Sequence, residues 1–326
     1  MSTSVYPYLP VEQRREAEAQ STANELSWLL NSLEETLLAL RIGLEECATL
    51  LAPVQPGSTL VLSSPRSERI KGHVTRVGHT IVRGTLSLRL RSHAPLNLAV
   101  ASTSSTESSS TTLPELGFPL ATLTALRMLL QKSLDCLDMT HFTGPRASAA
   151  ARDSAAQFFA SQLRLLQSFL QESLSILKGS SPPLTSSNSC RPSVYEAAAW
   201  YSEESECISF TPELPSAVVL NVNIHECSLL VTIRVLESCA QQPTLGSRFL
   251  TGIGAQRPLE HDELNKEFTY RGESVRVKEK YRVESSADPC LLSCASKLEA
   301  LERTVLGARE ALRVVMDLEQ KTELKT

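Results

Sequence analysis

Leucines at heptad spacing constrain this chain more than any other feature of its sequence. Between residues 26 and 51 apolar residues recur at alternating steps of 4 and 3, with no polar interruption. The same spacing returns between residues 291 and 315, where Pro289 is well placed to open a helix. Such spacing gives an α-helix one apolar face, which needs a partner surface. The seam positions that we expect to be buried include Leu26, Leu30, Leu33, Leu37, Leu40, Leu44, Leu298, Leu301, Val305, Leu312 and Val315.

Two further helices are predicted in the middle of the chain, at about 114–139 and about 150–178, where leucines recur at helical spacing. Four long amphipathic helices most simply form an antiparallel bundle. The seams could instead form a dimerising leucine zipper. Four helices of similar length in one chain favour the internal bundle, and therefore a monomer over a homodimer.

Elsewhere the apolar residues alternate with a period of two, which is typical of a strand with one buried face. The stretches TIVRGTLSLRLRS, from residue 80, and ESVRVKEKYRVES, from residue 273, are the clearest cases. A third strand-like stretch, at 214–238, is rich in β-branched residues and predicts a core hairpin. Together they predict a separate, mainly antiparallel β domain.

The expected fold is therefore α+β and elongated, with a long-helix bundle formed by both chain ends and the middle helices. We assign residues 11–52, 113–178 and 287–322 to the helical bundle domain, and residues 57–101 and 194–284 to the β domain. Stretches rich in Ser, Thr, Gly and Pro at 101–112, 179–193 and 241–258 are interpreted as flexible linkers or loops.

Composition narrows the classes of protein that the chain can represent. Its net charge of −4 and pI near 6.0 argue against a nucleic-acid partner. No run approaches the ~18 apolar residues of a membrane span, and the N-terminus does not resemble a signal peptide. The eight cysteines show no repeated spacing, which favours reduced thiols over a disulfide framework. We expect a soluble, cytoplasmic protein.

The motifs of common enzyme and metal sites are missing from the sequence, so we expect no catalytic activity, cofactor or metal. TGIGAQ, at 251–256, lacks the third glycine of a dinucleotide fingerprint and is interpreted as a loop. Cys290 and Cys294 lie one helical turn apart, but Cys294 falls on the seam, which favours a buried thiol over a metal ligand. His73 and His79 are interpreted as surface residues. An enzyme with an unrecognised site remains the third alternative.

Charge is distributed unevenly along the predicted β domain. Residues 57–101 contain seven Lys or Arg and one Glu, whereas residues 193–238 contain one Arg and seven Glu. In the last predicted strand, alternation would place Arg276, Lys278, Lys280 and Arg282 on one face. This basic face is our candidate for docking an acidic partner or an anionic membrane. The alternative is a solvated face or a charged edge that opposes aggregation.

Several short stretches, in the same order along the chain, resemble the Rogdi family. They are Trp28-Leu29-Leu30, Ile70-Lys71-Gly72, the strand pair that begins at Leu214-Pro215-Ser216 and continues through Asn221 to Ile224 and then from Leu229 to Leu236, and the F-x-Y-R-G run Phe268–Gly272. With the final long helix, the resemblance covers most of residues 25–316. It does not extend to the stretches at 101–112 and 241–258, which look different in length.

The Rogdi resemblance implies a function that the residues alone do not. The family includes the second subunit of the RAVE complex, the regulator of the ATPase of vacuoles and endosomal membranes. The resemblance implies a non-enzymatic adaptor that binds the large scaffold subunit of that complex and helps the V1 sector of the V-ATPase rejoin the Vo sector, in support of vacuolar acidification. Such a protein would be cytoplasmic and peripherally associated with vacuolar or endosomal membranes. The alternative is a generic self-associating leucine zipper scaffold unrelated to the proton pump.

Overall fold

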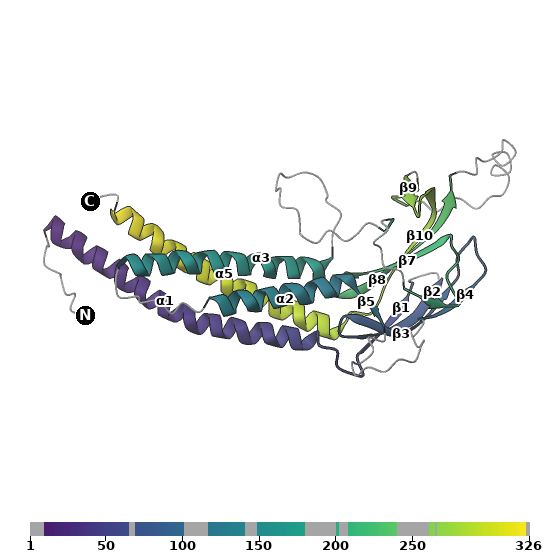
Figure 1. Cartoon of the computed structure of the whole chain (residues 1–326), viewed down its shortest axis with the longest axis horizontal. Coiled ribbons are helices and arrows are strands. Elements are labelled where there is room, and N and C mark those ends of the chain that lie inside the picture. Colours follow the sequence, from purple (N-terminus) through teal and green to yellow (C-terminus); the bar gives the residue numbers. More distant parts are fainter. Residues whose placement is uncertain are drawn as a thin grey trace, which may run out of the picture. The chain divides into compact units, whose positions relative to one another are not determined.

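The computed structural model describes residues 10–64, 69–100, 117–140, 149–179, 200–201, 208–239, 261–264 and 266–323. These residues form helices and antiparallel sheets, so the predicted α+β class is confirmed (Figure 1). Two compact units share the chain: Met1–Thr49, Met128–Leu174 and Ser296–Thr326 form the first, and Leu50–Arg127 and Ser175–Ala295 the second. The predicted linkers at 101–112, 179–193 and 241–258 lie outside the described residues, apart from Gly179.

In the part of the chain that the structure describes, the leucine-rich stretches form four long helices. They are α1 (Val11–Leu50), α2 (Ala121–Met139), α3 (Ala149–Lys178) and α5 (Pro289–Glu323). The seam positions are buried almost completely, with Leu26 and Leu298 each 0% exposed. Leu37 and Leu301 are exceptions and are only half-buried. Heptad spacing therefore identified the buried side of the helices at both chain ends.

Side chains within the first unit show which helices face one another. Gly43 of α1 lies so close to α5 that a Cβ at this position would be 2.6 Å from Cδ2 of Leu301. Polar contacts join further pairs: Arg41 with Asp138 (α1 and α2, 2.7 Å), Glu46 with Lys297 (α1 and α5), Cys136 with Gln162 (α2 and α3, 3.2 Å) and Gln171 with Glu302 (α3 and α5, 2.9 Å).

The start of α2 differs from the prediction. A helix was expected from about residue 114, but Phe118–Pro119 is a short strand, β5, and α2 begins at Ala121. Pro119 favours an extended conformation in the residue before it and so opposes a helix there. The N–H of Leu120 donates to the carbonyl of His79, which ties this segment to a sheet instead.

The first sheet of the second unit consists of β1 (Ser58–Ser63), β2 (Ile70–Val77), β3 (Thr80–Leu88), β4 (Leu96–Val100) and β6 (Phe210–Thr211), in that order, with β5 paired to β3. The register aligns Leu60 with Val74, Ile70 with Leu88, and Leu86 with Leu98, and all of these residues are buried. This sheet therefore has one apolar inner face and one polar outer face.

The second sheet has the order β7–β8–β10–β9, formed by β7 (Val218–His225), β8 (Ser228–Ser238), β10 (Glu273–Glu284) and β9 (Glu267–Tyr270). The predicted hairpin at 214–238 is β7 and β8. Its two-residue turn, Glu226 and Cys227, has φ values of 46° and 59°, as in a type I′ turn. Both turn N–H groups donate to the last carbonyls of α3, those of Lys178 (3.2 Å) and Leu177 (3.0 Å). The hairpin turn thus caps that helix.

A buried ion pair ties β2 to the start of α5. Arg76 Nη2 lies 2.6 Å from Asp288 Oδ2, and the two side chains are 2% and 0% exposed. Asp288 Oδ1 also accepts from the N–H of Cys290 at 2.9 Å, so Asp288 caps the helix. Sequence patterns did not reveal this pair, because its residues are separated by more than 200 positions.

Candidate protein-binding surfaces

A β-bulge divides the predicted basic face. In the pairing of β10 with β8, Val277 lies opposite Leu236 and Glu279 lies opposite Val235, so Lys278 has no opposing residue. Neighbouring residues of β8 point to opposite sides of the sheet, and hence Val277 and Glu279 also do. Arg276 therefore lies on the opposite face from Lys280 and Arg282. This corrects the unbroken alternation assumed from the sequence, while partner binding by these cations stays a prediction.

Two of the four cations are engaged within the second unit. Arg276 pairs with Glu267 of β9. Lys280 is 8% exposed, and its Nζ lies 2.7 Å from Asp262 Oδ1 and 2.6 Å from Glu263 Oε1. Lys278 and Arg282 are exposed. Arg276 is exposed as well, so Lys280 is the one of these four cations that is withdrawn from solvent.

The ion pairs of Lys280 belong to a larger buried charge cluster. Arg234 of β8 lies directly opposite Lys280, and Glu263 is shared by both cations, accepting from Arg234 Nε at 2.8 Å and Nη2 at 3.0 Å. Arg234 Nη1 donates to Asn221 Oδ1 at 3.2 Å, and Arg234 Cζ lies 4.8 Å from the centroid of the Trp200 ring. Two adjacent cations need a shared anion when buried. The cluster thus holds the segment at Asp262 and Glu263 against the sheet.

The cluster shifts both of its carboxyl groups toward the ionised form. Burial raises the pKa of Glu263, but hydrogen bonds from Arg234 and Lys280 outweigh burial and leave this pKa below its usual 4.5. The hydrogen bond from Lys280 lowers the pKa of Asp262 below its usual 3.8. Both groups therefore act as fixed anions at neutral pH.

Glu279 is directed by the bulge to the other side of the second sheet. It is 5% exposed and accepts hydrogen bonds from Ser92 Oγ, Tyr281 Oη at 2.6 Å and the N–H of Arg91 at 3.1 Å. Burial raises the pKa of Glu279, but these donors outweigh burial and lower it. Burial and the bond to Glu279 raise the pKa of Tyr281. These hydrogen bonds satisfy the buried carboxylate of Glu279, and those from Arg91 and Ser92 link β10 to the connection between β3 and β4.

The basic block at 57–101 exposes cations on the outer face of the first sheet. Lys71, His73 and Arg83 are exposed there, and His73 Nδ1 lies 3.1 Å from Thr85 Oγ1. His79 lies elsewhere, with its Nδ1 2.8 Å from Arg127 Nη1. The block's one acidic residue, Glu68, is outside the described residues. This face is a second charged surface, and sequence reasoning noted its charge but not its position.

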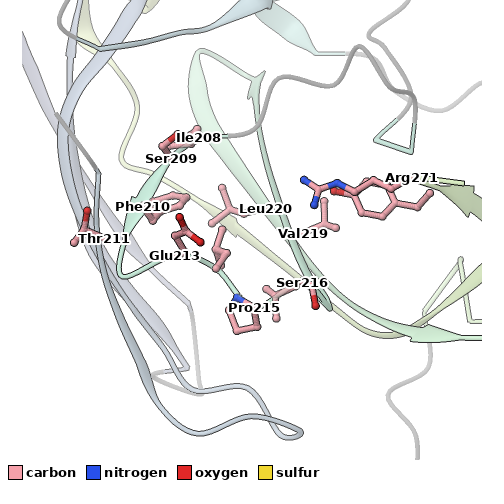
Figure 2. Close-up of a pocket in the computed structure, with 13 residues that line it drawn as sticks. Ile208, Ser209, Phe210, Thr211, Glu213, Pro215, Ser216, Val219, Leu220 and Arg271 are labelled. Carbon is pink, nitrogen blue, oxygen red and sulfur yellow. The ribbon is translucent and has the colours of Figure 1, made fainter. Parts of the chain in front are cut away.

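A pocket of about 600 Å³ lies between β6 and β7, at the end of one sheet and the edge of the other (Figure 2). Ile208 and Phe210 line one side, and Val219 and Arg271 line the other. The lining side chains of Ile208, Phe210, Val218, Val219 and Leu220 are buried, whereas those of Ser209, Thr211, Glu213, Ser216 and Arg271 are exposed. An apolar floor with a polar rim is typical of a binding site. Sequence reasoning missed it, because strand order was unknown.

The remaining sequence candidates do not converge on a chemical site. Cys294 is fully buried, as expected for a seam thiol, and Cys290 lies near Ser58. No group of three or more His, Cys, Asp or Glu is suited to a metal ion within the described ranges. TGIGAQ at 251–256 lies outside them. The described part of the chain contains six cysteines, and none of these six forms a disulfide.

None of the helices in the described part of the chain has an apolar stretch long enough to cross a membrane.

Comparison with known proteins identifies the family. None of the curated proteins compared with the chain matches it. A family model described as Rogdi leucine zipper containing protein matches residues 25–313. This range contains the Trp28, Ile70, Leu214 and Phe268 stretches on which the sequence resemblance was based. The match covers most of the chain, and the chain therefore belongs to the Rogdi leucine zipper family.

Proposed function

We propose that this protein is a non-enzymatic adaptor of a RAVE-like complex, which promotes assembly and reassembly of the V1 and Vo sectors of the vacuolar proton-translocating ATPase. The family match over residues 25–313 carries the proposal. The Rogdi family, as the sequence resemblance implies, includes the second RAVE subunit. The partners proposed are the large RAVE scaffold subunit and the V1 sector. The proposed location is the cytoplasm and, peripherally, vacuolar or endosomal membranes.

The surfaces of the second unit support a role in binding proteins. The pocket between β6 and β7 and the exposed cations Lys71 and Arg83 are accessible features of a kind that adaptors use. The self-associating zipper is the weaker alternative, because the seam residues that it would use, such as Leu30 and Leu312, are 0% exposed within a single chain.

The adaptor proposal is tested by deleting the gene and measuring how much V1 remains on vacuolar membranes after acidification is interrupted and restored. We expect less membrane-bound V1 and slower reacidification, both rescued by the wild-type chain. Affinity purification of the tagged full chain should recover V1 subunits and a large scaffold protein. Normal V1 recovery in the deleted cells, together with purification of the chain alone, would contradict the proposal.

A further inference from the structure

The pocket in Figure 2 lies beside an open sheet edge. β7 is the edge strand of the second sheet, and β6 is the last strand of the first. Val218, Val219 and Leu220 of β7 all line the pocket. Successive strand residues point to opposite faces of a sheet. Three successive lining residues therefore mean that the pocket faces the backbone edge of β7 as well as its side chains.

The hydrogen-bond phase of the hairpin shows which backbone groups point into this space. The N–H of Leu236 donates to the carbonyl of Ala217 at 2.7 Å, which makes these residues a hydrogen-bonded pair. Such pairs alternate, so Val219 and Asn221 direct their backbone groups toward β8. Leu220 and Val222 direct theirs outward. Within the described ranges, their outward N–H and C=O groups meet no backbone partner.

The ends of the pocket restrict where a strand could bind. The outward N–H of Val218 is already used, donating to the carbonyl of Pro215 at 2.8 Å. Glu213 and Ser216 lie at this end, and Arg271 extends from the β9–β10 turn. Ile208 and Phe210 form an apolar wall next to β6, with exposures of 7% and 5%. In the described part of the chain, the outward groups of β7 that have no backbone partner thus begin at Leu220, inside the pocket, and continue with Val222.

We propose that the pocket binds an extended segment of a partner protein, which adds to β7 as a further antiparallel or parallel strand. Backbone groups of Leu220 and Val222 provide the hydrogen bonds. Small or apolar side chains of the segment contact Ile208, Phe210 and Leu220, and its polar side chains contact the rim. A sheet edge recognises a peptide in this way in strand addition. The occupant is an extended polypeptide because the outward N–H and C=O groups of every second β7 residue match the hydrogen-bonding groups of an extended backbone.

This inference extends the adaptor proposal by naming the chemistry of a partner, but its test does not involve the proton pump. Failure of the peptide test leaves the pump-assembly proposal standing, and normal pump assembly does not affect the pocket. Nine-residue peptides displayed on phage serve as the probe, selected on the full chain. The tightest binder is then synthesised and its Kd measured by fluorescence anisotropy.

Strand addition has a signature with a period of two, because only alternate amides of a bound strand face β7. N-methylation of the peptide at amides of one parity should weaken binding at least 10-fold. Methylation at the other parity should change Kd less than 2-fold. If methylation at either set of alternate amides changes Kd equally, the proposal is overturned. A library that yields no binder also overturns it.

A matched pair of tryptophan variants locates the binding site. Ser209 is an exposed residue of the pocket, and Ser274 is an exposed residue of β10 that does not line it. We expect Ser209→Trp to weaken peptide binding at least 10-fold and Ser274→Trp to leave it unchanged. Equal binding by the two variants would place the peptide elsewhere and overturn the proposal. A dimer that is present without the peptide and dissociates when the peptide is added would instead identify a second copy as the occupant, and would also overturn it.

Discussion

At the scale of single residues, burial decides which charges of β10 are structural. Lys280 contacts Asp262 and Glu263 and is 8% exposed, whereas Lys278 occupies the bulge and is exposed. We expect Lys280→Glu to lower the free energy of unfolding by about 3–5 kcal/mol, because it removes a buried ion pair and adds a third carboxylate beside two others. Lys278→Glu, with the same change in charge, should stay within about 0.5 kcal/mol. Urea unfolding of both variants measures this, and equal losses would contradict it.

The charge cluster also predicts a dependence of stability on pH. The pKa values of Glu263 and Asp262 are lower in the folded chain than their usual 4.5 and 3.8. Ionised carboxyl groups therefore stabilise the fold above the unfolded pKa values, and this contribution is lost as pH falls through the folded ones. At pH values below about 4.5, we expect the free energy of unfolding to decrease as the pH is lowered. Near pH 7 both carboxyl groups are ionised, so small changes in pH should not alter their contribution.

Glu263→Gln tests the assignment of the acid sensitivity. The variant should be less stable at pH 7, since Arg234 and Lys280 lose their shared anion, but its stability should fall less between pH 6 and pH 3. Glu273→Gln, at an exposed position of β10, is the control and should retain the wild-type slope. If the stability of Glu263→Gln falls between pH 6 and pH 3 as steeply as that of the wild type, the charge cluster is not the source of the acid sensitivity.

At the scale of elements, local patterns predicted the helices and strands better than their pairing. Leucine spacing placed α1 and α5, and alternation identified β3 and β10. The bulge at Lys278 could not be predicted, because it depends on the register with β8 rather than on the sequence of β10. Burial still alternates through the bulge: Val277 packs with Trp200 and Leu236 on one face, and Glu279 bonds to Ser92 on the other. The alternation of buried and exposed residues along β10 therefore does not reveal that the bulge turns Val277 and Glu279 to opposite faces of the sheet.

Two glycines, one in a strand and one in a helix, give opposite predictions. A Cβ at Gly72 of β2 would lie 2.0 Å from the carbonyl oxygen of Thr85, so β2 and β3 would have to move apart. A Cβ at Gly307 of α5 would meet no atom within 4 Å. We expect Gly72→Ala to destabilise by about 3 kcal/mol, and Gly307→Ala to stabilise by about 0.5–1 kcal/mol through helix propensity. Thermal unfolding of both variants measures the difference, and a neutral Gly72→Ala would show that the sheet tolerates the shift.

At the scale of the whole molecule, the candidate sites combine segments that are distant in sequence. The charge cluster draws on Trp200, Asn221, Arg234, Glu263 and Lys280, and the pocket is lined from Ile208 to Arg271. A single sequence shows that such residues exist, but not that strand order brings them together. The predicted docking face was a property of one strand and could be proposed from local alternation. The pocket depends on two sheets, which is why sequence analysis missed it.

The oligomeric state is the last property that the buried seams predict. A zipper dimer would need exposed apolar seams, yet Leu26, Leu30, Leu298, Val305 and Leu312 are each 0% exposed in a single chain. We therefore expect a monomer of 35.7 kDa whose mass in sedimentation equilibrium does not change with concentration. Trp28, Leu38 and Ile42 of α1 are exposed by 68%, 61% and 52%, and they are the alternative contact for self-association. If the mass rises toward that of a dimer, replacing these three residues with Ala should restore the monomer. A dimer that survives this replacement would mean that the seams themselves exchange between chains.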